Sequence, residues 1–286
     1  MPAPILVVRR RHIYLLCFTL TSIAAATRLL RQPVCPRGML PAYSHNDYIN
    51  PHPLRDALGL GYKGVEADIF LVAGELRLGH DRAAAQRGAA FEAQYVAPLE
   101  SLVTRCRTLT LDGTPFLLTV ELKESSQPTF DTLTALLARH PSLFSSDSAE
   151  ALAPTHAAAA VQVVLVGWYP PGFALASPVP LWRQEHLRHA RPLVITDPAV
   201  ALISLDYGKT VGQWWVTHDR RQRWLATIRA IKAAYPALRV RVHDVPVDER
   251  VYRELLAAGV DLIGTMRLAE TAQRLTSIEG PVKVPR

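Results

Sequence analysis

The sequence predicts an α/β protein, a TIM-type (β/α)8 barrel, and three observations support this prediction. After Pro41, short apolar runs alternate with amphipathic segments roughly eight times, a pattern typical of parallel βαβ units. The last unit ends in the strand-like sequence GVDLIGT. No GxGxxG or GxxxxGK[ST] loop follows the first strand, as it would in many doubly wound sheets, so a closed barrel is favoured over an open sheet.

The expected strands are short apolar runs bounded by glycine, proline and polar residues. They cover Met39–Ser44, Gly64–Leu71, Glu75–Gly79, Pro115–Leu122, Val161–Trp168, Leu193–Thr196, Arg239–Val242 and Val260–Ile263. Four amphipathic segments between them are expected to form helices: PLRDALGLG, TFDTLTALLARH, RRQRWLATIRAIKAAYP and DERVYRELLAAG. Each stops at a glycine, at a proline or after cationic residues, which are the usual signals of a helix end. A long loop is expected from Pro170 to Pro180.

The chain is expected to have three parts, of which the middle one is the folded domain. Residues 1–38 are an N-terminal signal peptide or anchor with its linker, residues 39–280 the barrel, and residues 281–286 a tail. Arg9–Arg11 precede about fourteen apolar or small residues and an alanine-rich end, which is the layout of a secretory signal. We therefore expect a secreted or membrane-anchored protein of the secretory pathway, with membrane association through this segment. A mitochondrial presequence is the alternative, because the segment is rich in arginine and lacks acids.

Composition and charge narrow the class of protein. The chain has 286 residues, of which 49% are hydrophobic, and a formal net charge of +7. Its basic residues are scattered and show no aromatic–basic repeat, so no nucleic-acid partner is expected. The three cysteines, Cys17, Cys35 and Cys106, contain no CxxC pair. Either Cys35 and Cys106 form a disulfide bridge or both are free thiols.

Acidic residues interrupt two of the expected strands. Glu66 and Asp68 are two residues apart in GVEADIF, so in a strand both carboxylates point to the same face. Glu121 and Lys123 repeat this spacing in LLTVELK. Burying such charges costs several kcal/mol per ion unless they are paired or bind a cation. We therefore expect Glu66, Asp68 and Glu121 at the carboxyl-terminal mouth of the barrel, as oxygen ligands of one divalent cation, Mg²⁺ or Ca²⁺.

Two histidines complete this set. His45 follows the first expected strand and His80 follows the strand formed by GELRLG. A neutral and a protonated imidazole can act as base and acid near neutral pH. Lys123 supplies positive charge for an anionic group of a substrate. A cation, an ammonium and two histidines around one pocket indicate cleavage of a phosphodiester.

The motif carried by these residues resembles a known superfamily. The sequence HNDY…PL…AL..G…VEADIFLV.GELRLGH, followed by ELK, is similar to the phospholipase C-like phosphodiesterases, which include glycerophosphodiester phosphodiesterases and bacterial phosphatidylinositol phospholipase C. SHNDY and EADI.L..GEL..GH resemble most closely the altered inheritance of mitochondria protein 6 family. The close match covers Tyr43 to His80 and Glu121–Lys123. It implies a TIM-type barrel and a metal-dependent phosphoric diester hydrolase that acts on a phospholipid or glycerophosphodiester.

The resemblance also implies roles for single residues. The catalytic pair would be His45 and His80, the metal ligands Glu66, Asp68 and Glu121, and the phosphate contact Lys123. Asn46, which stands where glycerophosphodiesterases carry an arginine, is assigned with Lys123 to substrate binding. A second departure is GTMR at Gly264–Arg267, where a Thr-Asp pair is expected. These departures leave a second hypothesis, a catalytically inactive relative that binds lipid head groups or metal.

The charged residues of the motif have a second interpretation, as ordinary surface charges without a role in a site. On an exposed edge strand, Glu66 and Asp68 would pair with Arg55 or Lys63 as ordinary surface charges. Glu121 and Lys123 would likewise form an outward-facing pair on their strand.

Three further features of the second half of the chain have competing interpretations. Trp214 and Trp215 are expected to pack in the core, with a lipid- or sugar-binding mouth as the alternative. Asp219 is expected to cap a helix. His243 lies either at the barrel mouth or in an ordinary polar loop.

Overall fold

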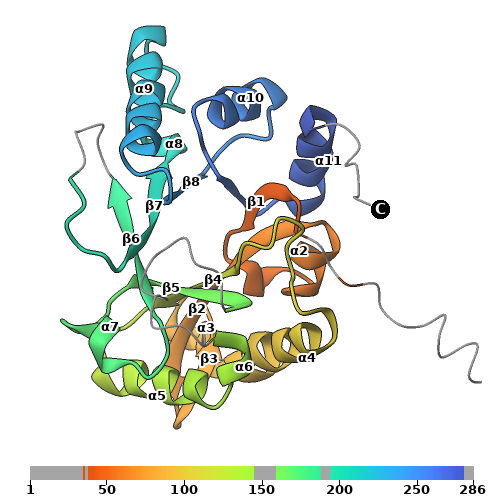
Figure 1. The fold of residues 1–286 in the computed structure, drawn as a ribbon, viewed down its shortest axis with the longest axis vertical. Helices are drawn as coiled ribbons and strands as arrows, with labels where there is room; N and C mark the ends of the chain where they lie inside the picture. The colour runs from red at the N-terminus through yellow and green to blue at the C-terminus, as the bar shows by residue number, and fades with distance from the viewer. Residues whose placement is uncertain (1–34, 36–37, 145–158, 188–193, 280–286) are drawn as a thin grey trace, which may run out of the picture. The chain divides into compact units, whose positions relative to one another are not determined.

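The first strand closes the barrel. The computed structural model describes residues 35, 38–144, 159–187 and 194–279. The chain divides into the units Met1–Cys35 and Pro36–Arg286, and the barrel belongs to the second. Strand β1 (Leu40–Ser44) pairs in parallel with both β2 (Tyr62–Val72) and β9 (Leu262–Thr265), so the sheet has no free end between them (Figure 1).

Eight parallel strands of the described residues form the barrel, as the sequence predicts. The five strands between β2 and β9 are β4 (Phe116–Leu122), β5 (Val161–Gly167), β6 (Trp182–Leu187), β7 (Val200–Asp206) and β8 (Arg239–His243), each paired with the next. Strand β3 (Glu75–Leu78) pairs antiparallel with β2 and stands outside the barrel order. The turn between them contains Gly74 at φ +84°, a conformation that glycine adopts without strain.

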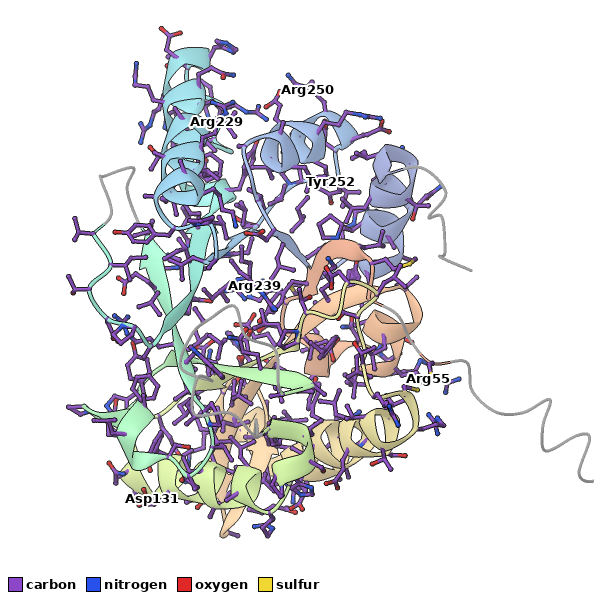
Figure 2. All side chains as sticks on the ribbon, in the orientation of Figure 1. Arg55, Asp131, Arg229, Arg239, Arg250 and Tyr252 are labelled. Carbon is purple, nitrogen blue, oxygen red and sulfur yellow. The ribbon has the colours of Figure 1, made fainter. Side chains whose placement is uncertain are left out.

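Helices follow most of the strands. They are α2 (Arg55–Gly59), α3 (Arg82–Arg87), a π-helical turn (Glu92–Val96) that continues into α4 (Ala97–Cys106), α5 (Gln127–Ala138), α6 (Pro141–Phe144), α7 (Phe173–Ala176), α8 (Tyr207–Thr210), α9 (His218–Ala234), α10 (Glu249–Ala257) and α11 (Leu268–Glu279). Helices α10 and α11 pack side by side (Figure 1). Tyr252 of α10 is buried and its hydroxyl is 3.0 Å from Thr271 Oγ1 of α11 (Figure 2).

The strands bury both of their faces. The large apolar cluster joins one face of the strands to the helices. A second cluster comes from six strands and from no helix, so it fills the barrel interior: Tyr43, Leu117, Val164, Trp182, Ala201, Leu202 and Leu262. Burial on both faces explains why β5 and β7 are continuous apolar runs and do not alternate.

One predicted strand is wrong. Positions 194–196 of the expected strand Leu193–Thr196 are not a strand, and two strands, β6 and β7, flank this stretch. The sequence of β6, WRQEHL, has no apolar run because its polar side chains lie toward the carboxyl-terminal end of the strand. The other predicted strands agree with the structure to within two residues at each end.

Two further expectations in the second half are corrected. Trp214 and Trp215 are 91% and 58% exposed, so they do not pack in the core. Helix α9 is capped by Thr217, whose hydroxyl accepts the backbone N–H of Arg220 at 3.3 Å, and Asp219 lies in its first turn. The expected loop from Pro170 to Pro180 contains the single turn of α7.

The structure also decides between the two interpretations of Cys35 and Cys106. Cys35 and Cys106 are disulfide-bonded, so the interpretation as free thiols is wrong. The N-terminal signal or anchor predicted for residues 1–38 lies almost entirely outside the described residues, as does the tail 281–286. Among the helices that the structure describes, none combines the length and the apolar character needed to cross a bilayer.

Candidate active site

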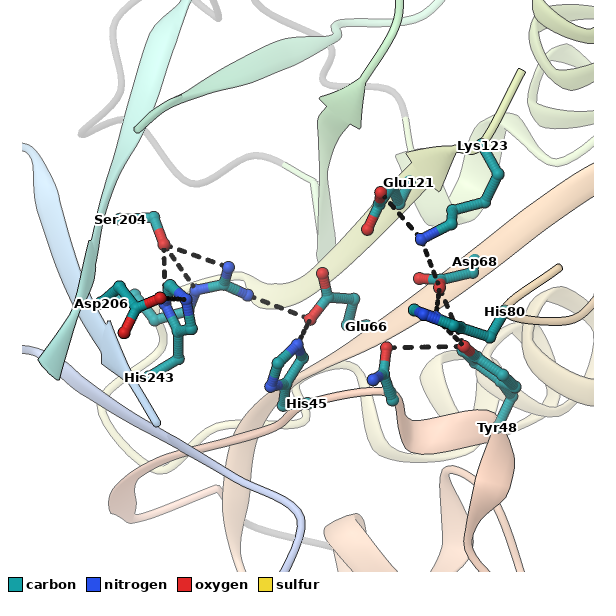
Figure 3. Close-up of polar contacts among 12 residues, drawn as sticks. His45, Tyr48, Glu66, Asp68, His80, Glu121, Lys123, Ser204, Asp206 and His243 are labelled. Atoms are coloured by element: carbon teal, nitrogen blue, oxygen red, sulfur yellow. Dashed lines mark hydrogen bonds and ion pairs between the residues drawn. The ribbon is translucent and has the colours of Figure 1, made fainter. Parts of the chain in front are cut away.

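Three carboxylates meet at the carboxyl-terminal ends of β2 and β4. Glu66 and Asp68 alternate along β2 and share a face, and the parallel register places Asp68 opposite Glu121 of β4. One carboxylate oxygen of each residue lies within 4.8 Å of the others (Figure 3). Glu66 and Asp68 are 2% and 0% exposed, so their interpretation as surface charges is wrong. The structure therefore brings together all three acids that the sequence pointed to.

Lys123 neutralises part of this acidic cluster. It follows the last residue of β4, and its Nζ lies 3.2 Å from Asp68 Oδ2 and 3.1 Å from Glu121 Oε1. Burial alone would lower the pKa of Lys123, but the charges of Asp68 and Glu121 outweigh burial and raise the pKa above its ordinary value. Lys123 is therefore a stable ammonium at the mouth, and the outward-facing alternative is wrong.

The two predicted histidines contact different carboxylates of the cluster, His45 beside Glu66 and His80 beside Asp68 (Figure 3). His45 Nε2 lies 3.5 Å from Glu66 Oε2. His80 Nδ1 lies 3.2 Å from Asp68 Oδ2, and 67% of its side chain is exposed. Both rings thus contact an acid of the cluster, and the His80 ring is also open to solvent.

The loop after β1 is held by a buried carboxylate. Asp47 is fully buried and accepts hydrogen bonds from the Ser44 hydroxyl at 2.6 Å, from the Tyr95 hydroxyl at 2.9 Å and from the backbone N–H of Leu54 at 2.5 Å. Burial raises the pKa of Asp47, although these hydrogen bonds oppose the shift. The bonds tie the loop to β1, α2 and the π-helical turn, and so fix the segment that carries His45.

Asn46 and Tyr48 extend this loop toward His80. Asn46 is in the left-handed region, with φ 49°, which asparagine tolerates better than most residues. The Tyr48 hydroxyl donates to Asp68 Oδ2 at 2.8 Å and lies 3.4 Å from His80 Nδ1. It is also 3.5 Å from Asn46 Oδ1. Tyr48 was not among the predicted site residues, although it belongs to the HNDY motif.

The last strand supports His45 through its backbone. The carbonyl of Thr265 accepts the backbone N–H of His45 at 2.9 Å, and the Thr265 hydroxyl accepts the N–H of Arg267 at 2.9 Å. Arg267 turns away to an ion pair with Glu270 in the first turn of α11. The GTMR segment therefore contributes main-chain positioning and no acid.

A buried arginine that the sequence analysis missed connects Glu66 of β2 to Ser204 of β7. Arg241 of β8 is 3% exposed, donates to Glu66 Oε2 at 3.2 Å and donates twice to Ser204 Oγ, at 3.3 and 3.1 Å. Its guanidinium also lies over the ring of Tyr43, 4.6 Å from the centroid. The signal was present in the strand sequence RVRVH, where Arg239, Arg241 and His243 share one face with period two.

A family model matches the first part of the barrel. Residues 32–140 match the AIM6-like phosphodiesterase domain. This part of the chain is similar to that family. The matched range contains every site residue predicted from the sequence, whereas Arg241 and His243 lie outside it. The matched domain is a phosphodiesterase domain, which supports a phosphoric diester hydrolase. None of the curated proteins compared with the chain matches it.

Solved structures with similar folds are also phosphodiesterases. The glycerophosphodiester phosphodiesterase from Agrobacterium tumefaciens str. C58 is 17% identical, with a TM-score of 0.50 over 82% of this chain and 99% of its own. A putative glycerophosphoryl diester phosphodiesterase from Silicibacter pomeroyi DSS-3 is 12% identical, with a TM-score of 0.51 over 86% of this chain and 97% of its own. At these identities the likeness shows the fold, and it confirms the predicted TIM-type barrel.

The acids of the AIM6-like domain fit a hard divalent cation. All three offer carboxylate oxygens, the donors that Mg²⁺ and Ca²⁺ prefer. Asp68 Oδ1 is buried and finds no hydrogen-bond donor among the described residues, although a buried carboxylate oxygen normally has one. An unpartnered oxygen inside an acidic cluster is a ready cation ligand.

Replacing Arg241 with methionine should destabilise the barrel by about 3 kcal/mol, because Glu66 would remain buried without its ion-pair partner. The free energy of unfolding in urea measures the effect. Arg250→Met is the control, since Arg250 is 72% exposed and its pair with Glu254 should contribute less than about 1 kcal/mol. Equal stabilities of the two variants would contradict the structural role of Arg241.

His243 forms the wall of the mouth beyond His45. Its ring lies 5.6 Å from that of His45 and 5.8 Å from that of His186. Burial, together with the charges of Arg241 and His45, lowers the pKa of His243 to about 3, while Asp206, with Oδ2 3.7 Å from Nε2, opposes the shift. Ser204 Oγ, 3.3 Å from Nδ1, already accepts two N–H groups of Arg241, so its hydroxyl proton is left for Nδ1. His243 is therefore neutral in the folded protein.

The neutral state of His243 makes stability depend on pH. Its folded pKa, about 3, is below the unfolded value of about 6.5, so the unfolded chain takes up the proton first as the pH falls. The stabilisation is complete above the unfolded pKa and is lost as pH falls toward the folded one. Between pH 7 and 5 the wild type should lose about 2 kcal/mol more unfolding free energy than His243→Gln. Urea unfolding at the two pH values measures this difference. An equal change in unfolding free energy for the wild type and His243→Gln would refute the assignment.

Proposed function

We propose that the AIM6-like domain is a metal-dependent phosphodiesterase that cleaves a phospholipid or a glycerophosphodiester by acid–base catalysis with His45 and His80. The observation that carries the proposal is the convergence of three carboxylate oxygens between two histidines at the mouth of the barrel (Figure 3). Active sites of TIM barrels lie at this end of the strands. The family of residues 32–140 supports the reaction class.

Glu66, Asp68 and Glu121 would hold one divalent cation, Mg²⁺ or Ca²⁺. When bound, such an ion neutralises negative charge on the phosphoryl oxygens of the substrate. Arg241 keeps Glu66 in place from the barrel interior, and Tyr48 does the same for Asp68 from the loop after β1. These two contacts orient the acids whether or not the ion is present.

The two histidines move the protons. His45 takes the proton of the attacking hydroxyl, whose oxygen forms the new bond to phosphorus. His80 gives a proton to the alcohol oxygen as its bond to phosphorus breaks. His80 Nδ1 lies against the Asp68 carboxylate, so Nε2 is the nitrogen left to face the substrate. The contacts of the two rings with different carboxylates support separate roles as base and acid (Figure 3).

Lys123 and Asn46 would contact the phosphoryl group. Lys123 retains its charge, since its neighbours raise its pKa, and a fixed ammonium stabilises charge that develops on oxygen. Asn46 Oδ1 faces the Tyr48 hydroxyl, which leaves the amide nitrogen of Asn46 to donate to a phosphoryl oxygen.

Phosphorus NMR of the products tests the proposal. The full chain should convert phospholipid and glycerophosphodiester substrates to phosphomonoesters or cyclic phosphates, and the resonances identify the bond that is broken. Removal of divalent ions by a chelator should reduce turnover by at least about a hundredfold, and added Mg²⁺ or Ca²⁺ should restore it. Full turnover in the presence of chelator would contradict the metal requirement. Saturable binding of these diesters without turnover would instead favour the inactive relative.

A further inference from the structure

Exposed apolar side chains gather at the end of the barrel that carries the site. Among the described residues, the exposed large hydrophobic residues are Ile49, Leu175, Val194, Trp214, Trp215 and Met266. Five of them lie in segments that directly follow the carboxyl ends of barrel strands: Ile49 after β1, Leu175 after β5, Trp214 and Trp215 after β7, and Met266 after β9. The acids and histidines of the site occupy the same ends of the strands.

Val194 is the exception and lies toward the opposite end. The next residue, Ile195, donates its backbone N–H to the hydroxyl of Tyr235 at 3.0 Å, and Tyr235 ends helix α9 on the way to the start of β8. Asp197 forms an ion pair of 2.6 Å with Arg183, near the start of β6. Apolar exposure is thus concentrated at the mouth and is not spread over the barrel.

Ile49, Leu175, Trp214, Trp215 and Met266 are called the rim of the mouth below. The two tryptophans are its largest side chains. Their rings form an edge-to-face pair 5.7 Å apart between α8 and α9. Trp214 is 91% exposed and Trp215 58%, so each leaves most of its ring in water. The segment from β7 to α9 that carries them follows Asp206, whose carboxylate faces His243 at the mouth. Tryptophan side chains combine a large apolar ring with a polar N–H and favour the boundary between water and lipid.

The charge around the pair complements an anionic surface. The segment Tyr207–Arg223 contains four basic residues, Lys209, Arg220, Arg221 and Arg223, and one acid, Asp219. Lys209 and Arg221 form ion pairs with Asp206 and Glu254, and Lys209 is nevertheless 84% exposed. Arg220 and Arg223 are exposed as well. Basic side chains beside exposed tryptophans are the combination by which proteins bind at the surface of anionic bilayers.

We propose that the mouth of the barrel docks on a phospholipid bilayer, with Trp214 and Trp215 in the lipid interface, and that the phosphodiester substrate is a lipid of that bilayer. This inference rests on the proposed function, and it selects membrane phospholipids over soluble glycerophosphodiesters as the substrate class. Docking through this rim places the acids and the two histidines against the lipid head groups.

Vesicles and a soluble diester together test the proposal. The full-length wild type, the double variant Trp214→Ala/Trp215→Ala and the control Val194→Ala are compared on phosphatidylcholine vesicles that contain phosphatidylglycerol, and on glycerophosphoglycerol in solution. The double variant should bind vesicles at least about tenfold more weakly and hydrolyse vesicle lipid at least about tenfold more slowly, because two large apolar side chains are removed. Its turnover of glycerophosphoglycerol should equal that of the wild type, and Val194→Ala should match the wild type throughout.

The outcomes separate this inference from the proposed function. Docking through the rim is overturned if the wild type does not bind vesicles, or if the double variant binds and hydrolyses them as the wild type does. It is also overturned if sedimentation equilibrium shows that the substitutions dissociate a dimer, since the tryptophans would then face a second copy of the chain. Failure of the wild type to hydrolyse either substrate with Mg²⁺ or Ca²⁺ present would sink the proposed function, while the vesicle affinities would still decide the docking.

Discussion

Replacing either His45 or His80 with alanine should lower kcat for diester turnover by about 10²- to 10⁴-fold, which is the usual contribution of a positioned acid or base. Each ring contacts a carboxylate of the cluster from its own side, so neither can take over the position of the other. The loss should appear mainly in kcat, because the metal ligands and Lys123 are unchanged. Rates measured on a soluble glycerophosphodiester with saturating Mg²⁺ or Ca²⁺ give the comparison.

The matched control is His52→Ala. His52 lies in the same loop as His45, is 62% exposed and contacts Asp56, away from the carboxylates. This variant should retain turnover within about twofold, because an exposed pair of this kind contributes little. Circular dichroism establishes that all three variants are folded. If His45→Ala or His80→Ala turned over the diester as well as His52→Ala does, the proposed acid–base roles would be wrong.

Replacing Asp68 with asparagine should reduce turnover about as much as the histidine substitutions do. Asp68 contacts Lys123, His80 and the Tyr48 hydroxyl through one oxygen, while its other oxygen has no donor among the described residues. Asp68→Asn keeps the shape but removes a charged ligand of the proposed cation, whose contribution to catalysis is several kcal/mol. We expect kcat/KM to fall by about 10³-fold or more at any concentration of Mg²⁺ or Ca²⁺.

Glu124→Gln is the control for this substitution. Glu124 is a partly exposed carboxylate just after the end of β4, and it accepts hydrogen bonds from Thr129 at 2.7 Å and from the backbone of Leu71 at 3.1 Å. Its neutralisation should change kcat/KM by less than about threefold, since Glu124 is not part of the acidic cluster. Activity of Asp68→Asn within tenfold of the wild type would contradict its role as a metal ligand.

Local spacing was enough to predict most of the barrel and its acidic cluster. Glu66 and Asp68 are two residues apart, and residues at this spacing in a strand always point to the same face. The conclusion that they face inward depends only on the apolar residues that alternate with them. Convergence with Glu121 then follows from the parallel register of neighbouring strands.

Two strands were missed, and β6 shows where such spacing is insufficient. Strand β6 carries Gln184, Glu185 and His186 near the mouth, so its sequence does not differ from that of a polar loop. Only pairing with β5 and β7 makes it a strand, and pairing over this distance is not encoded in the local pattern. The apolar run of β7 did carry a signal, but Asp197 and Pro198 before it resemble a turn.

Arg241 was missed and the tryptophan pair was assigned to the core, for opposite reasons. A buried arginine is rare, and nothing near Arg241 in the sequence identifies its partner, Glu66, which lies 175 residues away. Large aromatic residues are usually buried, so the general rule favoured the core for Trp214 and Trp215. Their exposure beside the mouth departs from that rule, as expected where a surface serves a function.

Titration calorimetry of the metal-free, full-length chain with Mg²⁺ and with Ca²⁺ tests the central claim most directly. We predict that the wild type binds one ion per chain, and that the variant Glu66→Gln/Asp68→Asn/Glu121→Gln is folded and gives no binding heat with either ion. The absence of binding by the wild type, or equal affinity in the triple variant, would contradict a cation site formed by these three carboxylates.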